Sequence, residues 1–586
     1  MKKTFLLLAV LSGAFISSAQ AIVLVKNNVA VAGIVIAKDA SDQVQFAAKM
    51  LQQYLQKSTG ATLPIRNAAQ GTSNLYVGKG AYRGIDNGNL DEDGFILQSV
   101  DGNNFVILGG SDWGTEFGVY DFLERFVGVR WLIPTDVGTV VPKLSTLQVP
   151  TVKIVDNPAY LSRAISPIWI DKNTIPMNQW GRFNRLRSRV DASHNLRNLF
   201  PPEKFARSNP EFYPEVKGKK ILPQTNNDQG WQPDFTANGI ADAASKEIVS
   251  WFGQHKDATN YSLGINDSQN FNESGNNARS LSVKNAVGFS NFSDQYYAWA
   301  NDVVNKVRKV YPGKKYPVLA YTSVAEPPSD NKVDKDIIPF IAFERLRWGA
   351  SSVKKTDQDL TERWAQAASS LGWYDYVYGF MYLLPRVWFH SMQEYLAWGY
   401  AHKVRYYYGE LYPNWGEGPK PWVMAKLLWN PNQDVDALLD DWYRNAAGKQ
   451  GGPKLKAYYA IWEKFWSQDI FANGANAGVH AKIVFFDPSY LLQVPDDYLT
   501  QSDKLLADAA KLAETDQQRQ LVARLTQMWT IYRDSVVAYK KYKQGGKNSP
   551  EGQERLRLLQ SLKSDLLYSL PANSILSRAT VAGNDW

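Results

Sequence analysis

A carboxylate follows the most strand-like stretch in the second half of the chain. Bulky side chains occupy both faces of residues 404–408, VRYYY, which predicts a β-strand, and Gly409 lets the backbone turn directly before Glu410. The loop beyond Glu410 contains Tyr412 and Trp415 instead of the Lys and Ser of an ordinary solvent loop. An acid beside flat apolar rings at a strand end suits the cleavage of a glycosidic bond. The alternative is that Glu410 merely ends the strand and forms a structural ion pair.

Asp267 is the second candidate carboxylate. It follows Asn266 and a short predicted strand, Tyr261–Ile265, and it precedes a loop rich in Asn and Ser. Glycosidic hydrolysis requires two carboxyl groups across one bond, about 5 Å apart when one is a nucleophile and farther apart when water must fit between them. We therefore predict Glu410 and Asp267 as the catalytic pair. The alternative for Asp267 is the cap of a helix or turn.

Other side chains are expected at the same site. Glu326, before a Pro pair, and Asp375, within an aromatic strand, are reserve carboxylates. His194 suits a hydrogen-bond donor to substrate, or else a structural role. With 5 histidines, none paired at ligand spacing, and no cysteine, the sequence predicts neither a metal site nor a cofactor. The predicted substrate-binding residues are Asn266, His194, Trp231, Tyr321, Glu326, Asp375, Tyr382 and Trp415.

The elements that must position these residues are short strands alternating with helices between residues 151 and 450. Such alternation predicts parallel strands with crossover helices, closed into a (β/α)8, TIM-like barrel. The carboxyl ends of barrel strands face the active site, which would bring Asp267, Tyr321, Asp375 and Glu410 to one mouth. The predicted strands are Ala164–Ile170, His194–Leu199, Tyr261–Ile265, Val318–Thr322, Ile338–Phe343, Tyr374–Tyr378 and Val404–Tyr408.

Two further domains are predicted to flank the barrel, because 586 residues are too many for one hydrophobic core. Residues 22–150 combine strand-like runs with an amphipathic helix that Ser41 caps and Gly60 ends, which predicts a small α/β domain. Residues 451–586 have helical periodicity. The fold class predicted for the whole chain is therefore α/β multidomain with a helical C-terminal domain.

The first 21 residues predict a cleavable signal peptide. Lys2 and Lys3 precede an apolar run, and Ala19-Gln20-Ala21 suits a cleavage site, so we expect a periplasmic or secreted protein. No later run reaches the roughly 18 apolar residues of a membrane span. The net charge of +8 is dispersed, which argues against nucleic acid as a partner. Aromatic residues make up 13% of the chain, enough both to fill large cores and to stack on sugar rings.

A pattern of short motifs extends from about residue 25 to 450. Its parts are Ala40–Ile65, Gly109–Trp131, Trp180–Asn184, Asn209–Pro214, Trp231–Pro233, Ser262–Asp267, Ala320-Tyr321, Pro327-Pro328, Glu410 and Trp429–Pro431. Together they resemble the bacterial DUF4838 domain family, part of which is classed as glycoside hydrolase family 163. The resemblance implies a hexosaminidase- or α-glucuronidase-like N-terminal domain, a catalytic barrel, and endo-β-N-acetylglucosaminidase activity on complex N-glycans.

These observations predict a glycoside hydrolase that cleaves an N-acetylhexosamine-containing glycan with Glu410 and Asp267. Two alternatives stay open. One is a non-catalytic carbohydrate-binding protein on a degenerate glycosidase scaffold, which would bind glycans without releasing product. The other is an α-glucuronidase-like hydrolase. A glycan is the expected partner in all three.

Overall fold

The computed structural model describes residues 21–168, 176–379, 382–472, 474, 476, 487–546 and 549–561. Residues 1–20 of the predicted signal peptide lie outside these ranges. The chain separates into two compact units, the first made of residues up to Val129 with Val141–Asn157, the second of Arg130–Val140 and everything from Pro158. The barrel and the helical domain that the sequence predicts therefore belong to one compact unit.

The first unit contains a six-stranded sheet and a three-stranded sheet. The strands are β1 (Ile22–Lys26), β2 (Val29–Ala30), β3 (Ala32–Val35), β4 (Ile65–Arg66), β5 (Ser73–Val77), β6 (Phe95–Val100), β7 (Asn104–Gly109), β10 (Leu147–Val149) and β11 (Lys153–Asp156). The larger sheet has the order β11-β6-β7-β5-β3-β4 and the smaller β10-β1-β2. β3, β4, β5 and β7 are parallel, and β6 is antiparallel to both neighbours.

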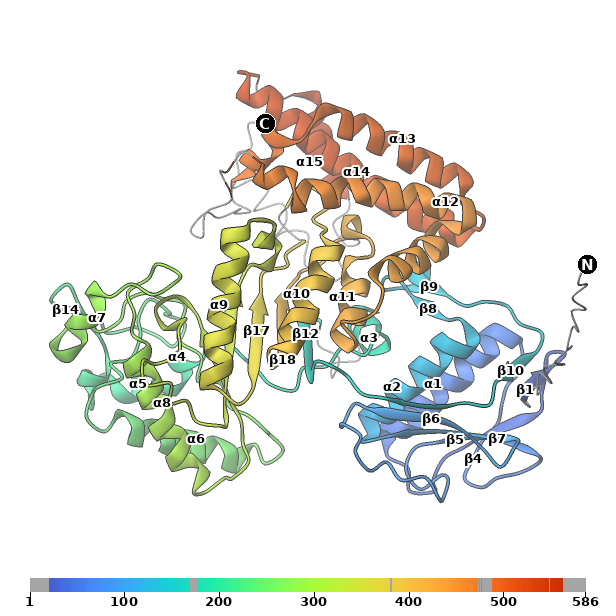
Figure 1. Cartoon of the computed structure of the whole chain (residues 1–586), viewed down its shortest axis with the longest axis horizontal. Helices are drawn as coiled ribbons and strands as arrows, with labels where there is room; N and C mark the ends of the chain where they lie inside the picture. The colour runs from blue at the N-terminus through green and yellow to red at the C-terminus, as the bar shows by residue number, and fades with distance from the viewer. Residues whose placement is uncertain are drawn as a thin grey trace, which may run out of the picture. The chain divides into compact units, whose positions relative to one another are not determined.

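Two helices pack together on the larger sheet (Figure 1). Helix α1 (Asp42–Thr59) begins at Ser41, whose hydroxyl accepts a hydrogen bond from Val44 N at 3.2 Å. It ends at Gly60, which has a φ of 75° that only glycine adopts without strain. Helix α2 (Asp112–Phe122) packs on β6 and β7. Local capping signals thus placed α1 correctly from the sequence.

The second unit contains a parallel sheet of five strands with the order β12-β18-β17-β16-β15. Its strands are β12 (Ser162–Ser166), β15 (Tyr316–Ala320), β16 (Ile337–Phe343), β17 (Leu371–Asp375) and β18 (Val404–Glu410). Ser166 pairs with Glu410, Gly409 with Asp375, and Asp375 with Phe343. The carboxyl ends of these strands therefore meet at one edge, as predicted for a site assembled there.

The predicted closed barrel is not found among the described residues, where this sheet has five strands. Two predicted strands take other forms. Leu196–Leu199 is a helical turn, α4, and residues 260–264 make only isolated parallel bridges, Asn260 with Lys315 and Gly264 with His194.

Polar side chains contribute to the contact between these two segments. Asn195 Nδ2 donates to the carbonyl oxygen of Ser262 at 2.9 Å, and Ser262 Oγ donates to that of Ser193 at 2.7 Å. They add to the backbone bonds from Asn195 N to Gly264, from Tyr261 N to Lys315 and from Leu263 N to Pro317. The segment keeps a strand-like path beside β15 without full strand pairing.

Alternation along the strands separates two faces of the sheet. One face contains the buried cluster Val190, Ala192, Leu319, Ile338 and Phe340, against which Tyr374, Tyr406 and Tyr408 pack. The other face carries Trp373 and packs against α9 (Ser351–Ala367), α10 (Phe389–Ala401) and α11 (Lys420–Trp429) (Figure 1). At Gly399 of α10, a Cβ would lie 2.5 Å from the Trp373 indole, so only glycine allows this close approach.

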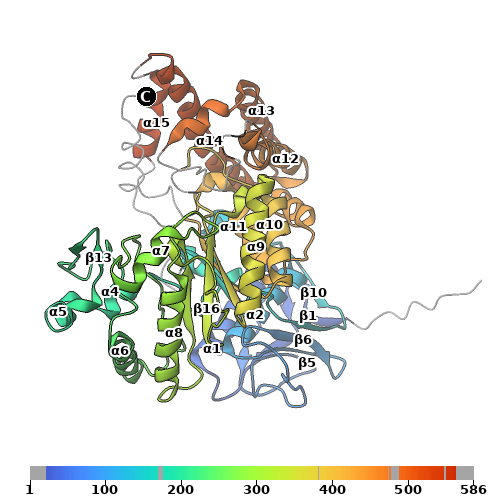
Figure 2. The same ribbon diagram turned by 60° about the vertical axis from the view of Figure 1, so that its left-hand side comes forward.

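Further short elements and two helices complete this part of the unit. Helices α6 (Ile240–Gln254) and α8 (Ser293–Arg308) pack against each other (Figure 2). The remaining elements are β8 (Arg130–Trp131), β9 (Thr139–Val140), α3 (Pro176–Phe183), α5 (Pro202–Phe205), β13 (Glu215–Val216), β14 (Lys219–Lys220) and α7 (Ala278–Ser282).

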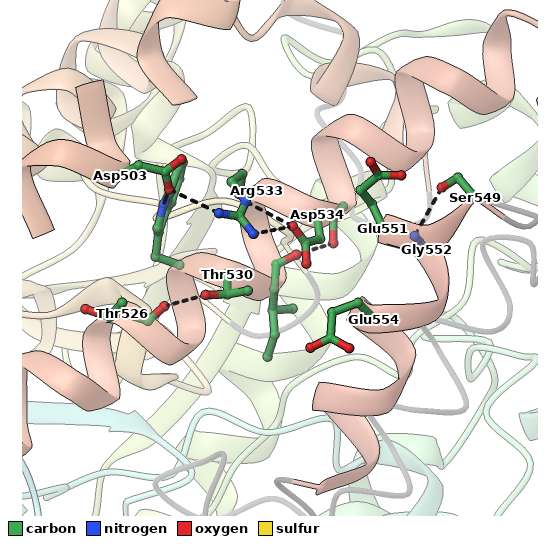
Figure 3. Close-up of polar contacts among 12 residues, drawn as sticks. Asp503, Thr526, Thr530, Arg533, Asp534, Ser549, Glu551, Gly552 and Glu554 are labelled. Atoms are coloured by element: carbon green, nitrogen blue, oxygen red, sulfur yellow. Dashed lines mark hydrogen bonds and ion pairs between the residues drawn. The ribbon is translucent and has the colours of Figure 1, made fainter. Parts of the chain in front are cut away.

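The C-terminal part of the second unit is helical, in agreement with the sequence periodicity. It contains α12 (Val435–Ser467), α13 (Asp496–Leu512), α14 (Asp516–Lys543) and α15 (Pro550–Ser561). Gly448, with φ 82° and ψ 178°, divides α12 into two segments. Figure 3 shows Arg533 of α14 bonded to Asp503 of α13 at 3.4 Å and to Asp534 at 2.9 Å. None of the helices in the described ranges is long and apolar enough to cross a membrane.

We predict a pH-dependent contribution from the contact between α10 and α12. His390 Nδ1 lies 3.0 Å from Glu463 Oε1, and this hydrogen bond raises the pKa of His390 to about 9. A raised histidine pKa stabilises the fold fully below its unfolded value of about 6.5, and this stabilisation is lost as the pH rises through 9. Because the imidazole is half exposed, the effect should stay below about 1 kcal/mol.

Urea unfolding of wild type and His390→Gln at several pH values between 6 and 10 measures this contribution. The difference between the two proteins should shrink as the pH rises. His255→Gln is the control, because the His255 ring faces the carbonyl oxygen of Trp251 instead of a carboxylate. A difference that is constant across this range would contradict the prediction.

Candidate active site

A pocket of about 200 Å³ lies at the carboxyl edge of the five-stranded sheet. Leu319 of β15 and Ala342 of β16 contribute apolar lining, and Tyr374 of β17 and Glu410 of β18 contribute polar groups. Asp267 follows the irregular segment beside β15 and lines the same pocket. The complete lining is His194, Asp267, Leu319, Tyr321, Ala342, Tyr374, Tyr376, Tyr378 and Glu410. The structure therefore places both carboxylates that were predicted as the catalytic pair in one pocket.

Three tyrosines form a wall of this pocket, and sequence reasoning missed them. Tyr374, Tyr376 and Tyr378 occur at every second position, so an extended backbone directs all three side chains to one side. The rings of Tyr376 and Tyr378 stack with centroids 6.4 Å apart. The sequence WYDYVY at residues 373–378 shows this period-2 pattern of tyrosines. The prediction chose Asp375, which lies on the opposite face of the strand from the three tyrosines.

Glu410 is surrounded by tyrosine hydroxyls. Tyr378 donates a hydrogen bond to Glu410 Oε2. Burial, and then the negative charge of Glu410, raises the pKa of both Tyr374 and Tyr378 well above the ordinary tyrosine value. The hydroxyls therefore stay protonated and can act as donors. Arg405, a cation on the same strand, donates to the carbonyl oxygens of Tyr400 and Val404.

Asp267 has a similar partner in Tyr321, whose hydroxyl donates to Asp267 Oδ1 at 3.3 Å. Burial raises the pKa of Tyr321 to about 12, with further contributions from the charges of Asp267 and Glu410. A hydrogen bond with Tyr376 lowers it slightly. Tyr321 lines the same pocket as both carboxylates.

His194 lines the pocket with a defined tautomer. Its Nδ1 contacts the carbonyl oxygen of Ile265, and because a carbonyl only accepts, Nδ1 carries a proton. The ring lies edge-to-face against Tyr321, with centroids 6.1 Å apart. In a neutral imidazole, Nε2 is then an acceptor for a hydroxyl group.

Two other predicted substrate contacts form the framework behind the pocket. Asn266 is fully buried, and its side chain accepts from Arg197 N at 2.8 Å and donates to the carbonyl oxygen of Trp231 at 2.9 Å. Trp231 is 1% exposed and packs on Tyr213. Both residues fix the start of the Asp267 loop and do not line the pocket.

The reserve carboxylates also lie elsewhere. Glu326 accepts hydrogen bonds from Ala286 N at 2.7 Å and Asn291, and pairs with Arg363 at 2.7 Å. Asp375 is fully buried and accepts from Arg345 N and from the hydroxyl of Tyr407, both at 3.0 Å. Asp375 faces away from Tyr374 and Tyr376 because neighbouring strand residues point to opposite faces.

Tyr382 and Trp415 are core aromatics and do not stack in the pocket. Tyr382 is 4% exposed, with the Arg386 guanidinium 4.1 Å from its ring centroid. Trp415 is 6% exposed, with the Arg524 guanidinium 5.3 Å from its ring. Their large buried area serves packing, which is the commoner use of these residue types.

Two buried cations hold the tyrosine wall in place. Beyond the end of β17, Arg386 Nη1 donates to the carbonyl oxygens of Tyr376 at 3.3 Å and Tyr378 at 2.9 Å. Lys420 Nζ donates to that of Val377 at 2.9 Å. Three successive carbonyl groups that have left the sheet are thus satisfied by charged donors, which keeps the segment extended.

Each of these cations has its own buried carboxylate. Arg386 pairs with Glu344, which follows β16, and Lys420 pairs with Glu417. Burial raises the pKa of Glu344 and of Glu417 and lowers that of Lys420. The gain from each ion pair therefore has to offset a large desolvation cost.

The loop after Glu410 is held by the helical part of the unit. Asn414 and Glu417 form a capping box around a short 3-10 turn, and the hydroxyl of Tyr532 in α14 donates to Asn414 Oδ1 at 2.6 Å. Gly416 lies so close to Tyr532 that a Cβ would be 2.4 Å from its ring. Across the described part of the chain, no cluster of three His, Asp or Glu side chains suits a metal ion.

Comparisons with known proteins show a glycosidase-like fold. Residues 133–460, more than half of the chain, match the family model described as domain of unknown function (DUF4838), and the chain belongs to that family. Residues 21–122 match the model of the glycosyl hydrolase family 67 N-terminus. No curated protein matches the sequence.

Solved structures with a similar fold include glycoside hydrolases. A family GH115 4-O-methyl-α-glucuronidase with specificity for decorated arabinogalactans has a TM-score of 0.59 at 12% identity, covering 96% of this chain and 80% of its own. A GH138 enzyme targeting pectin rhamnogalacturonan II has a TM-score of 0.51 at 10% identity, covering 95% and 93%. At such low identity the likeness establishes the fold and not the substrate.

The buried pair of Glu417 and Lys420 gives a prediction for stability. Lys420→Met should lower the free energy of unfolding by about 3–5 kcal/mol, because it leaves Glu417 and the Val377 carbonyl buried without a cation. Adding Glu417→Gln should recover part of this loss, since the unpaired charge is then removed. Urea unfolding at neutral pH measures all three proteins.

Lys355→Met is the control, because Lys355 forms an exposed pair with Asp359. Its removal should change the free energy of unfolding by less than about 1 kcal/mol. A double variant less stable than Lys420→Met would show that the pair is not the source of the loss.

Proposed function

We propose that this protein is a glycoside hydrolase that cleaves a glycan containing N-acetylhexosamine, with Asp267 and Glu410 as its carboxyl pair. One observation carries the proposal: two acidic side chains, distant in the sequence, line one pocket at the carboxyl edge of a parallel sheet. The DUF4838 family and the glycoside hydrolase fold support it. Within this class, an endo-β-N-acetylglucosaminidase of the family 163 type is the finer proposal, which rests on the sequence motifs.

The pocket supplies what glycosidic hydrolysis needs. One carboxyl group can protonate the leaving oxygen while the other attacks the anomeric carbon or activates water. Tyr321 and Tyr378 each donate a hydrogen bond to one of these carboxylates and so fix its orientation. His194 and the remaining tyrosine hydroxyls are positioned to bind sugar hydroxyl groups.

The charge of the pocket favours a neutral sugar over a glucuronate. Among the described residues that line it, two are carboxylates and the others are His, Tyr, Leu and Ala, with no Lys or Arg. A uronic acid carboxylate would therefore be bound beside two acids without a compensating cation, which is unfavourable in a partly buried site. This supports the hexosaminidase proposal over the α-glucuronidase alternative.

Export through the predicted signal peptide is part of the proposal. The support is the sequence of residues 1–21, with its two Lys residues, apolar run and Ala-Gln-Ala site. A periplasmic or extracellular location would give the enzyme access to glycans outside the cell.

Substitution of the two carboxylates tests the catalytic proposal. Glu410→Gln and Asp267→Asn should each lower the turnover of a chitooligosaccharide by at least about a hundredfold, because each removes acid, base or nucleophile assistance. The control is Glu394→Gln, which changes an exposed carboxylate of α10 that pairs with Lys354. Its turnover should match wild type, and unfolding curves verify that all variants fold.

A screen of wild type against N-glycans, chitooligosaccharides and glucuronides, read by mass spectrometry, tests the substrate. Release of products from the first two and none from glucuronides is expected. Glycan binding without any product would support the carbohydrate-binding alternative instead. Cleavage of glucuronides alone would show that pocket charge does not select the substrate as argued.

A further inference from the structure

A second pocket, of about 230 Å³, adjoins the first and is not used by the proposal above. Its lining is Asp267, Ser268, Gln269, Tyr321 and Thr322. Asp267 and Tyr321 line both pockets, and the 3.3 Å hydrogen bond between them makes them one shared wall. Glu410, in contrast, lines the first pocket only.

Thr322 carries evidence that the second pocket binds a ligand. The residue is 8% exposed, and its buried hydroxyl has no hydrogen-bond partner among the described residues. A buried hydroxyl without a partner costs free energy, and rotation of the Thr322 side chain toward a sugar hydroxyl in the pocket would remove this cost. Its neighbours on the wall, Ser268 and Gln269, offer a further hydroxyl and an amide.

The backbone of Thr322 is held in an unusual conformation. Its φ of 46° lies in the left-handed region, which a β-branched residue rarely adopts. The Asn285 side chain donates to the Thr322 carbonyl oxygen at 2.7 Å and stabilises this geometry. Such strain persists where surrounding contacts enforce it, and it is concentrated at functional sites.

We infer that the second pocket binds the leaving-group sugar of the substrate, and that Asp267 is the general acid. The inference rests on the proposed function. The first pocket is lined by Glu410, by the buried Leu319 and by the partly buried Ala342 of the sheet, and it holds the sugar whose anomeric carbon reacts. The glycosidic oxygen then lies at the shared wall, beside Asp267.

The reaction assigns a different task to each acid. The bond between the anomeric carbon and the glycosidic oxygen breaks, its electron pair moves to that oxygen, and the oxygen takes the proton of the Asp267 carboxyl. The anomeric carbon gains the oxygen of one water molecule, directly or after a Glu410 ester, and a water proton restores Asp267. Because Tyr321 donates to Oδ1, Oδ2 is the oxygen that carries the transferred proton.

The ligand of the second pocket is therefore a neutral, hydroxyl-bearing saccharide. Hydroxyl and amide groups bind sugar hydroxyls, whereas an aromatic leaving group offers them little to bind. Substrates with the same reacting sugar and different leaving groups consequently separate the two pockets. Chitotetraose presents a sugar to the second pocket, and dinitrophenyl β-chitobioside presents a ring that leaves without protonation.

Kinetics with these two substrates test the inference. Asp267→Asn should lower turnover of chitotetraose by at least about a hundredfold and that of the dinitrophenyl glycoside by less than about tenfold, since only the sugar needs an acid to leave. Glu410→Gln should lower both by at least about a hundredfold. Equal losses for Asp267→Asn on the two substrates would overturn the role of Asp267.

Thr322 tests the second pocket separately. Thr322→Val keeps the shape and removes the hydroxyl, so kcat/KM for chitotetraose should fall about tenfold with less than about a twofold change for the dinitrophenyl glycoside. Thr322→Ser is the matched control and should stay close to wild type. Equal effects of Thr322→Val on both substrates would overturn the leaving-group site.

Different results would contradict the proposed function and the role of the second pocket. If wild type cleaves neither substrate, the proposed function and the leaving-group site are both contradicted. If wild type cleaves both and the variants do not distinguish them, glycoside hydrolysis stands and the assignment of the second pocket is wrong.

Discussion

The position of the tyrosine wall depends on hydrogen bonds to three backbone carbonyl groups beyond the end of β17. At the end of β17 the chain leaves its ladder, yet Tyr376, Val377 and Tyr378 must stay extended for their alternate side chains to face Glu410. Arg386 and Lys420 satisfy these carbonyls from behind. Neutral donors would do so more weakly, because charge-assisted hydrogen bonds are roughly twice as strong. The pocket thus depends on cations that do not line it.

The charged side chains near the sheet differ between its two faces. The cations Arg345, Arg386 and Lys420 are buried in ion pairs with Asp357, Glu344 and Glu417. The pocket side carries Asp267 and Glu410 among hydroxyl groups. Paired charge on one side supports structure, while the acids on the other keep tyrosine partners and remain accessible to a ligand. This separation supports the proposal of a neutral substrate.

Five of the seven predicted strands overlap strands of the structure, and the two acids lie together as predicted, but the sequence did not show which aromatics surround them. Glu410 and Asp267 could be placed together because the carboxyl ends of parallel strands meet at one edge. Asp375 and Tyr374 are neighbours in the sequence. Only the structure shows that Tyr374 lines the pocket and that Asp375 is buried on the other face of the sheet. Trp231, Tyr382 and Trp415 are buried in packing, which a loop position in the sequence does not reveal. Periodicity predicted a closed barrel, because it does not reveal side-chain bonds between distant segments such as those from Asn195 to Ser262 and from Ser262 to Ser193.

The contact between Tyr532 and Asn414 has a consequence for how this unit comes apart. Because α14 fixes the loop that directly follows Glu410, the helical segment and the sheet share interactions that neither can replace alone. Heating should accordingly melt them together in one cooperative transition. The helices beyond residue 450 are in this sense part of the scaffold of the pocket, and a chain truncated at residue 450 would lose the shape of the pocket while it keeps Asp267 and Glu410.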